Sequence, residues 1–84
     1  MVNGSKVRLR VMENSTAPWH YHRASHEVFY VIAGRVFLDF ESRSEELTAG
    51  QLLTGPAMTK HRARATERAT VLAIDATDCD THRL

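Results

Sequence analysis

The chain lacks the covalent links that stabilise many very small domains. Its 84 residues include a single cysteine, Cys79, so no disulfide can form within the chain. Cys79 lies between Asp78 and Asp80, whose negative charges disfavour the thiolate, and a catalytic thiol is therefore not expected. One cysteine is also typical of a reducing compartment, so we expect a cytoplasmic location.

An excess of charge of one sign and long apolar runs are absent as well. Eleven lysines and arginines face ten aspartates and glutamates, which gives a formal net charge of +1. This balance gives no reason to expect nucleic acid or a membrane as a partner. The longest apolar run covers six residues, 28–33, and is far too short to cross a bilayer. The first residues lack the apolar core of a signal peptide.

A chain of this length is expected to form one small domain, 1–84. Such a domain buries only about 60 % of the surface that its unfolded chain exposes. Marginal cores of this kind are commonly supported by a metal ion or by association with another chain. Because disulfides are excluded, we expect one of these two supports.

The apolar pattern predicts strands. No segment keeps a 3.6-residue period over three turns, so little or no helix is expected. Short alternating segments separated by turn residues predict an all-β barrel or sandwich. The expected strands are 6–12, 27–33, 36–40, 46–48, 51–54, 60–67 and 70–75, and residues 76–84 are expected to form a solvated tail.

Alternation also assigns faces to the strands. In 6–12, the side of Val7 and Leu9 is expected to face the core, while the side of Arg8 and Arg10 forms a basic outer face. Strand 27–33 is apolar on both faces, so it should be covered on both. The second cover is expected to be another subunit, in a homodimer formed through Val28, Tyr30 and Ile32.

The stretch from 20 to 27 gathers groups that bind metals. His20 and His22 lie two apart on an extended segment and therefore point to the same side. Glu27 begins the apolar strand that follows. Two imidazoles and a carboxylate at the edge of a core, where an unpaired charge is costly, predict a metal ion. His61 is the candidate for a fourth ligand.

His26 is the alternative to Glu27 as a ligand, because it shares the parity of His20 and His22. The residues between, 23–25, are expected to form a loop, which removes the parity argument. In that case His26 lies at the rim of the pocket or in solvent.

The residues around this stretch resemble the first motif of the cupin superfamily, G(X)5HXH(X)3,4E(X)6G. Asn14, His20, His22, Glu27 and Gly34 match it at about 14–34, with asparagine in place of the leading glycine. Asparagine is among the better substitutes where φ must be positive. The motif spacing favours Glu27 over the neighbouring histidine as a ligand.

A second stretch, at about 50–65, resembles the other cupin motif, G(X)5PXG(X)2H(X)3N. Gly50, Pro56 and His61 match it. Met58 stands where the motif has its second glycine, and Ala65 where it has asparagine. Together the two resemblances cover roughly residues 6–75.

The resemblance implies a small cupin-type β-barrel, a jelly-roll-like double-stranded β-helix. It also implies one divalent transition metal held by His20, His22, Glu27 and His61. This donor set suits Fe(II), Mn(II), Ni(II), Co(II), Cu(II) or Zn(II). Four protein ligands on a six-coordinate ion leave two positions for a small molecule. The expected walls of its pocket are Phe29, Val31, Leu38 and Phe40, with Ala63 and Ala65 leaving room beside the metal.

Function is expected to be that of a metal-dependent enzyme on a small molecule, of dioxygenase or isomerase type. The alternatives are a non-enzymatic binding module, such as a pathway accessory protein, and a purely structural metal. No dedicated general base is evident. Tyr30 and Asp39 are candidates only if their side chains face inward.

Other notable side chains are expected to be structural. Trp19 and Tyr21 should pack against neighbouring strands or a dimer partner, with substrate stacking as the alternative. Met58 is expected to be a wall residue. A basic stripe is expected to be a solvated strand face, with an anionic substrate or partner near the rim as the alternative; it consists of Lys60, Arg62, Arg64 and Arg68.

Overall fold

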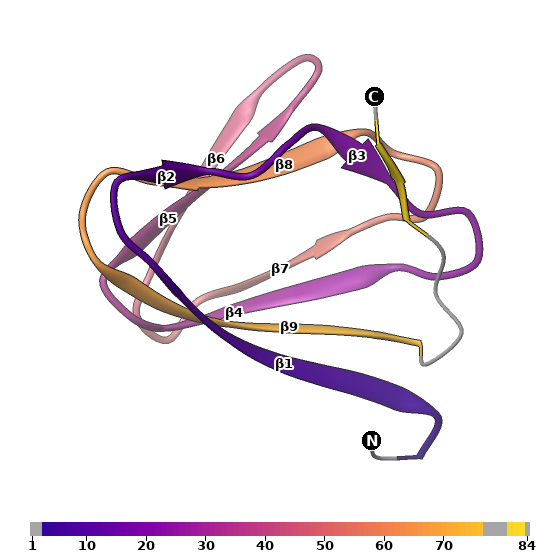
Figure 1. Cartoon of the computed structure of the whole chain (residues 1–84), viewed down its shortest axis with the longest axis horizontal. Coiled ribbons are helices and arrows are strands. Elements are labelled where there is room, and N and C mark those ends of the chain that lie inside the picture. The colour runs from indigo at the N-terminus through magenta and orange to yellow at the C-terminus, as the bar shows by residue number, and fades with distance from the viewer. Residues whose placement is uncertain (1–2, 77–80, 84) are drawn as a thin grey trace.

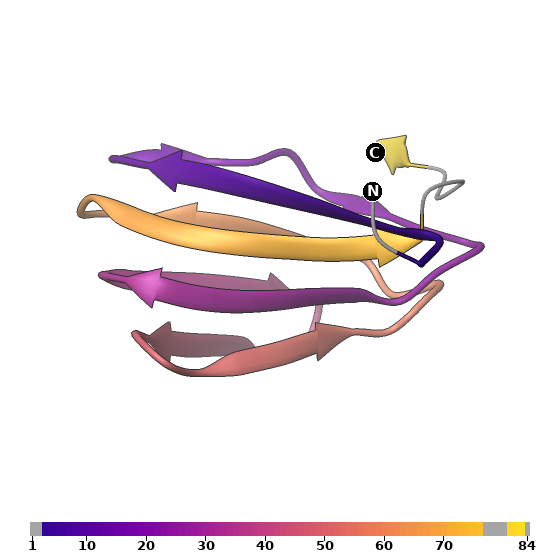
Figure 2. The same ribbon diagram turned by 90° about the horizontal axis from the view of Figure 1, so that it is seen from below.

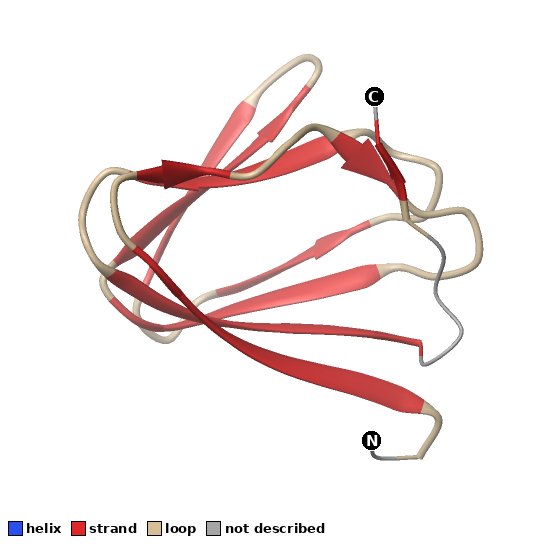
Figure 3. Ribbon diagram, viewed as in Figure 1, coloured by secondary structure: helices blue, strands red, loops and turns tan. Residues whose placement is uncertain are grey.

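The computed structural model describes residues 3–76 and 81–83. The chain forms two antiparallel β-sheets that face each other, and Figure 1 shows them as an upper and a lower layer. The described residues contain ten strands and no helix (Figure 3). The expected all-β fold is therefore confirmed. None of the segments within these ranges is a helix of the length and apolar character needed to span a membrane.

The first sheet, sheet A, has four strands that lie side by side in Figure 2. In spatial order they are β1 (Ser5–Met12), β9 (Ala69–Ala76), β4 (Glu27–Ala33) and β7 (Leu52–Gly55). Sheet B contains, in order, β10 (His82–Arg83), β3 (His20–Tyr21), β8 (His61–Ala65), β5 (Arg35–Phe40) and β6 (Ser44–Thr48), and β2 (Ser15–Thr16) also pairs with β8.

The core lies between the two sheets. Val31 of β4 and both Val36 and Leu38 of β5 have no exposed surface. The predicted inward faces of β5 and β8 are confirmed, because alternate residues of both strands are buried or packed against the core. The buried apolar residues are Met12, Phe29, Val31, Val36, Leu38, Phe40, Leu47, Ala65, Ala69, Val71 and Ala73.

Strand β1 alternates as predicted, but its faces are reversed. Val7, Leu9 and Val11 are 47 %, 63 % and 57 % exposed on the outer face of sheet A. Arg8 points between the sheets and reaches carboxylates on β4 and β9. The prediction of a basic outer face is therefore wrong. A strand's inner face depends on which side chains its neighbours present, and β1 alone does not carry this information.

Positive φ angles occur at the glycine positions of the two motifs. Asn14 has a φ of 45°, as its place in the first motif predicts, and Met58 has a φ of 68° where the second motif has glycine. Gly34, with a φ of 80°, cannot be replaced without movement, because a Cβ there would lie 2.5 Å from the carbonyl oxygen of Arg68. Met58, unlike this glycine, has a side chain, and its φ of 68° is therefore a backbone conformation that the residue disfavours.

The C-terminal prediction of a solvated tail over 76–84 is partly wrong. Ala76 ends β9, and β10 pairs with β3, so that His82 lies opposite Tyr21 and Arg83 opposite His20. The rings of Tyr21 and His82 stack with centroids 5.0 Å apart. The prediction about the thiol of Cys79 falls outside the described residues.

Candidate metal centre

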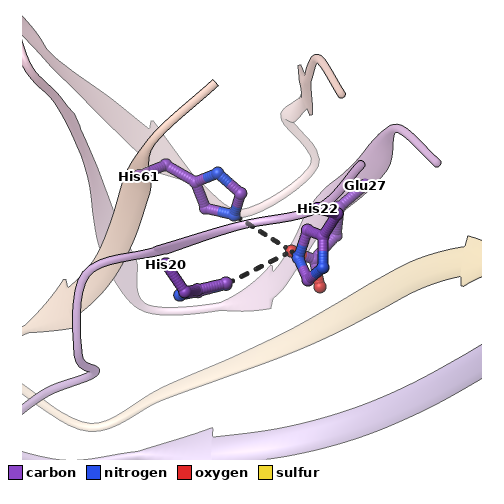
Figure 4. A group of neighbouring side chains, drawn as sticks. All are labelled: His20, His22, Glu27 and His61. Atoms are coloured by element: carbon purple, nitrogen blue, oxygen red, sulfur yellow. Dashed lines mark hydrogen bonds and ion pairs between the residues drawn. The ribbon is translucent and has the colours of Figure 1, made fainter. Parts of the chain in front are cut away.

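Four side chains from both sheets meet at one end of the space between the sheets. His20 of β3 and His61 of β8 are directly paired neighbours in sheet B. His22 follows β3 by one residue, and Glu27 is the first residue of β4 in sheet A. The chain thus brings together all four residues that the sequence predicted, as Figure 4 shows.

These four side chains converge on one carboxylate oxygen. Glu27 Oε1 lies 3.0 Å from His22 Nε2, 3.1 Å from His61 Nε2 and 3.8 Å from His20 Nε2 (Figure 4). One potential donor atom from each residue lies within 4.8 Å of the others. His61 has no exposed surface, and His22 and Glu27 are each 3 % exposed. The group is thus compact and largely shielded from water.

The opposite ring nitrogens are held by hydrogen bonds. His20 Nδ1 donates to the carbonyl oxygen of Pro18 at 2.9 Å, and His61 Nδ1 donates to that of Thr59 at 3.0 Å. A carbonyl only accepts, so both Nδ1 atoms carry the proton. In the neutral rings, Nε2 then presents a lone pair to the Glu27 oxygen. The Nε2 lone pairs and the carboxylate oxygen repel each other. A cation placed among these atoms would be coordinated by all of them, and hydrogen-bonded imidazoles of this kind are usual metal ligands.

Electrostatics at the site favour an ionised carboxylate. Burial by itself would raise the pKa of Glu27, but the rings of His20, His61 and His22, when protonated and donating to the carboxylate, outweigh burial and hold that pKa well below its usual range. The Glu27 carboxylate in turn raises the pKa of His20, against the opposing effect of burial. A carboxylate that stays charged beside imidazoles is the form that binds a divalent metal.

The second oxygen of Glu27 has a separate partner that the sequence did not predict. Arg8 Nη2 donates to Glu27 Oε2 at 2.8 Å and to Asp75 Oδ2 at 3.1 Å. The side chains of Glu27 and Asp75 are 4 % and 1 % exposed, whereas that of Arg8 is 33 % exposed. Arg8 therefore orients the carboxylate and leaves Oε1 turned toward the histidines.

His26 is not part of the cluster. Its Nδ1 accepts a hydrogen bond from the backbone N–H of Ala57 at 2.8 Å, and its side chain is exposed. The geometry therefore favours Glu27 over His26, as the motif spacing does.

A cavity of about 520 Å³ adjoins the cluster. Of the predicted wall residues, only Phe29 and Ala63 line it; Val31, Leu38, Phe40 and Ala65 are buried in the core instead. The prediction that Met58 forms a wall is wrong, since Met58 is 63 % exposed and outside this lining. The remaining lining residues are Arg8, Arg10, Met12, Ala17, Pro18, His20, His22, Glu27, Val71, Ala73, Thr81 and Arg83.

The two candidate bases lie elsewhere. Tyr30 is on the outer face of β4, opposite in parity to Glu27 and Phe29, and does not line the cavity. Asp39 accepts hydrogen bonds from Arg62 Nε at 2.8 Å and Arg64 Nε at 2.7 Å. The bond from Arg64 is the main reason that the pKa of Asp39 lies well below its ordinary value.

The two strand residues of the predicted basic stripe, Arg62 and Arg64, lie on the outer face of sheet B and are paired with a carboxylate, whereas Lys60 and Arg68 flank that strand. Arg62 and Arg64 share Asp39, and their guanidinium groups lie 4.9 Å and 4.5 Å from the ring centroids of Trp19 and Phe37. None of the stripe residues lines the cavity, so the alternative of an anion held by the stripe at its rim is not supported. The predicted structural packing of Trp19 is confirmed.

Comparison with known proteins shows the family to which this chain belongs. A family model described as a cupin domain matches residues 7–76. The uncharacterized protein YdbB of Bacillus subtilis (strain 168) is 33 % identical over 81 residues, which is 95 % of this chain and 71 % of that protein.

Solved structures of cupin proteins have the same fold as this chain. A cupin-2 domain containing protein from Shewanella frigidimarina is 26 % identical with a TM-score of 0.85, covering 90 % of this chain and 74 % of that chain. A cupin-like protein from Thermotoga maritima has a TM-score of 0.86 at 18 % identity, covering 99 % of this chain and 66 % of that chain. The match of the family model over most of the sequence, supported by the shared two-sheet fold, shows that the chain belongs to the cupin family.

Proposed function

We propose that the chain binds one divalent transition metal ion through His20, His22, Glu27 and His61, and that the ion binds and transforms a small molecule in the adjoining cavity. The observation that carries the proposal is the orientation of the imidazoles. The Nδ1 protons of His20 and His61 are committed to backbone carbonyls, so both Nε2 atoms face the Glu27 carboxylate. A cation satisfies this arrangement, whereas neutral imidazoles alone do not.

A bound divalent ion would supply Lewis-acid chemistry, and redox chemistry if it is iron, manganese or copper. The chain's own residues would exclude water and orient a ligand of the metal. Phe29, Val71 and Ala73 form an apolar wall that limits water beside the ligand. Arg8 holds the carboxylate of Glu27 in place from behind.

We favour oxidation of the ligand, of dioxygenase type, over isomerisation. An isomerase needs a group that moves a proton between carbon atoms or oxygens. The polar groups in the described lining of the cavity are the proposed metal ligands, three arginines and Thr81. The ligands would be occupied by the metal, the arginines are permanently charged, and Thr81 offers only a hydroxyl. This set of groups suits binding and orientation of a ligand better than proton transfer.

The test begins with elemental analysis of protein purified without an affinity tag or added metal. We expect near-stoichiometric Fe, Mn, Ni, Co, Cu or Zn, and a melting temperature that falls when a chelator removes it. Oxygen uptake is then screened with small molecules that offer two oxygen donors. A site that contains no metal and takes up none when it is added contradicts the proposal. A loaded site that binds ligands without oxygen uptake or turnover indicates the binding module instead.

We propose further that the chain forms a homodimer through the outer face of sheet A. Leu9, Leu72, Tyr30 and Leu52 stand in register and form one apolar row across all four strands. Val7, Ile74 and Val28 form a second row beside it. An uncharged face of this extent suits a partner with an equally uncharged face, and a second copy related by a two-fold axis presents one.

Sedimentation of the Leu9→Asp variant tests the dimer. Leu9 is 63 % exposed, so the change should leave the fold of one chain intact while placing a charge in the first apolar row of the proposed interface. We expect the wild type to sediment as a dimer at micromolar concentration and Leu9→Asp as a monomer. Ala49→Asp, in the exposed turn after β6, is the control that should remain dimeric. A monomeric wild type contradicts the proposal.

A further inference from the structure

We propose that the small molecule bound in the cavity carries an oxyanion, a carboxylate or a phosphate, and that Arg10 binds this group. The inference rests on the proposed function for the end of the ligand nearest the histidines. For the anionic end it rests on Arg10 alone. The oxyanion would lie at the mouth of the cavity, and the body of the ligand along its apolar wall.

The cavity carries positive charge that its own residues do not fully neutralise. Three arginines line it, Arg8, Arg10 and Arg83, and Glu27 is the carboxylate among the described lining residues. Arg8 is already paired with Glu27 and Asp75. The other two arginines are not among the described ion pairs, so their charge is available to a ligand. A concave surface with uncompensated positive charge attracts anions.

The position of Arg10 in sheet A directs its side chain to the cavity. It is two residues from Arg8 on β1, so both side chains lie on the inner side of sheet A. Its backbone partner on β9 is Val71, which also lines the cavity. Arg10 lines the cavity and is exposed as a residue, so it can be reached both from the cavity and from solvent. A hydrated guanidinium remains available to an entering anion and binds planar oxyanions through two parallel hydrogen bonds.

Apolar side chains line the same cavity as the polar groups. Met12, Phe29 and Val71 line the cavity together with His20 and Arg10. A ligand that spans this cavity would therefore have an anionic group at one end, an apolar or aromatic body, and oxygen donors at the other end. Small organic acids fit this description.

The experiment compares two probes of equal shape, benzoate and benzamide, by NMR titration of the full chain without metal and after loading with Zn(II). We expect benzoate to bind the wild type about tenfold tighter than benzamide in both forms. In Arg10→Met this preference should fall to near unity, and in Arg10→Lys to an intermediate value. Phenyl phosphate, titrated alongside, distinguishes phosphate from carboxylate as the preferred oxyanion.

Arg68→Met is the control, because it removes the same charge from an exposed turn outside the cavity and should keep the full preference. Zinc content and melting temperature of Arg10→Met should match the wild type. Equal affinity of the wild type for both probes overturns the proposal. A preference for benzoate that survives in Arg10→Met also overturns it. This holds if Arg83→Met removes the preference, and it holds if the preference is seen only with zinc bound. A metal-free chain that binds no zinc yet prefers benzoate through Arg10 refutes the metal centre and supports this site.

Discussion

The variant His61→Ala should bind divalent metal at least about a hundredfold more weakly than the wild type, a loss of about 2.7 kcal/mol. The variant His26→Ala should change the affinity less than about threefold. His61 is fully buried, and its Nε2 lies 3.1 Å from the carboxylate on which the other histidines converge. His26 instead accepts a hydrogen bond from Ala57 and does not face the cluster. One variant removes a ligand, and the other removes a loop contact.

Competition titration against a chromophoric chelator, with Zn(II) or Co(II), measures both affinities. Because alanine leaves a cavity where the imidazole was, His61→Gln serves as a second variant that retains most of the volume. Circular dichroism melting curves show whether each variant is folded. Equal losses of affinity in His61→Ala and His26→Ala would contradict the assignment of the ligands.

A second large effect is expected from Arg8→Met, which should lower the stability of the metal-free chain by about 2 to 4 kcal/mol. Removing one partner of a buried ion pair typically costs about 3 to 5 kcal/mol, because the other charge stays buried and unpaired. Here two carboxylates, Glu27 and Asp75, lose their shared partner. Since the Arg8 side chain is one-third exposed, solvent reduces the cost below the upper end of this range.

Urea unfolding of Arg8→Met with and without Zn(II) gives the measurement. A metal ion would take over the neutralisation of Glu27, so added zinc should stabilise the variant more than it stabilises the wild type. The double variant Arg8→Met with Asp75→Asn removes the buried charge of Asp75, which would otherwise keep only Lys6 Nζ at 3.9 Å, and should recover part of the loss. Unfolding of the single variant at the wild-type urea concentration would show that this ion-pair network contributes nothing to stability.

The ligand cluster could be predicted from the sequence because its signal is local. His20, His22 and Glu27 lie within eight consecutive residues, and His61 follows at a motif spacing that does not require knowledge of the strand order. The inward face of β8 could also be predicted, since alternation there separates alanines from arginines, whereas β5 carries an apolar residue, Phe37, on its outer face as well.

The cavity could not be predicted in the same way, because its walls come from pairings between distant strands. Arg8 and Arg10 looked like solvent-facing residues, since their neighbours on β1 are apolar. Their inward position depends on Asp75 of β9 and Glu27 of β4, which lie 67 and 19 residues away from Arg8 in sequence. Arg83 and Thr81 enter the lining through the pairing of β10 with β3, two short strands that carry no alternation of their own.

The origin of the ligands in both sheets has a mechanical consequence. Glu27 belongs to sheet A, while His20 and His61 belong to sheet B. An ion held by these side chains would be a cross-link between the layers, formed at the end where the cavity lies. Local separation of the layers would then require breaking metal–ligand bonds, so transient opening of this end would become rarer. In a chain whose single cysteine allows no internal disulfide, the bound ion would serve as its reversible equivalent.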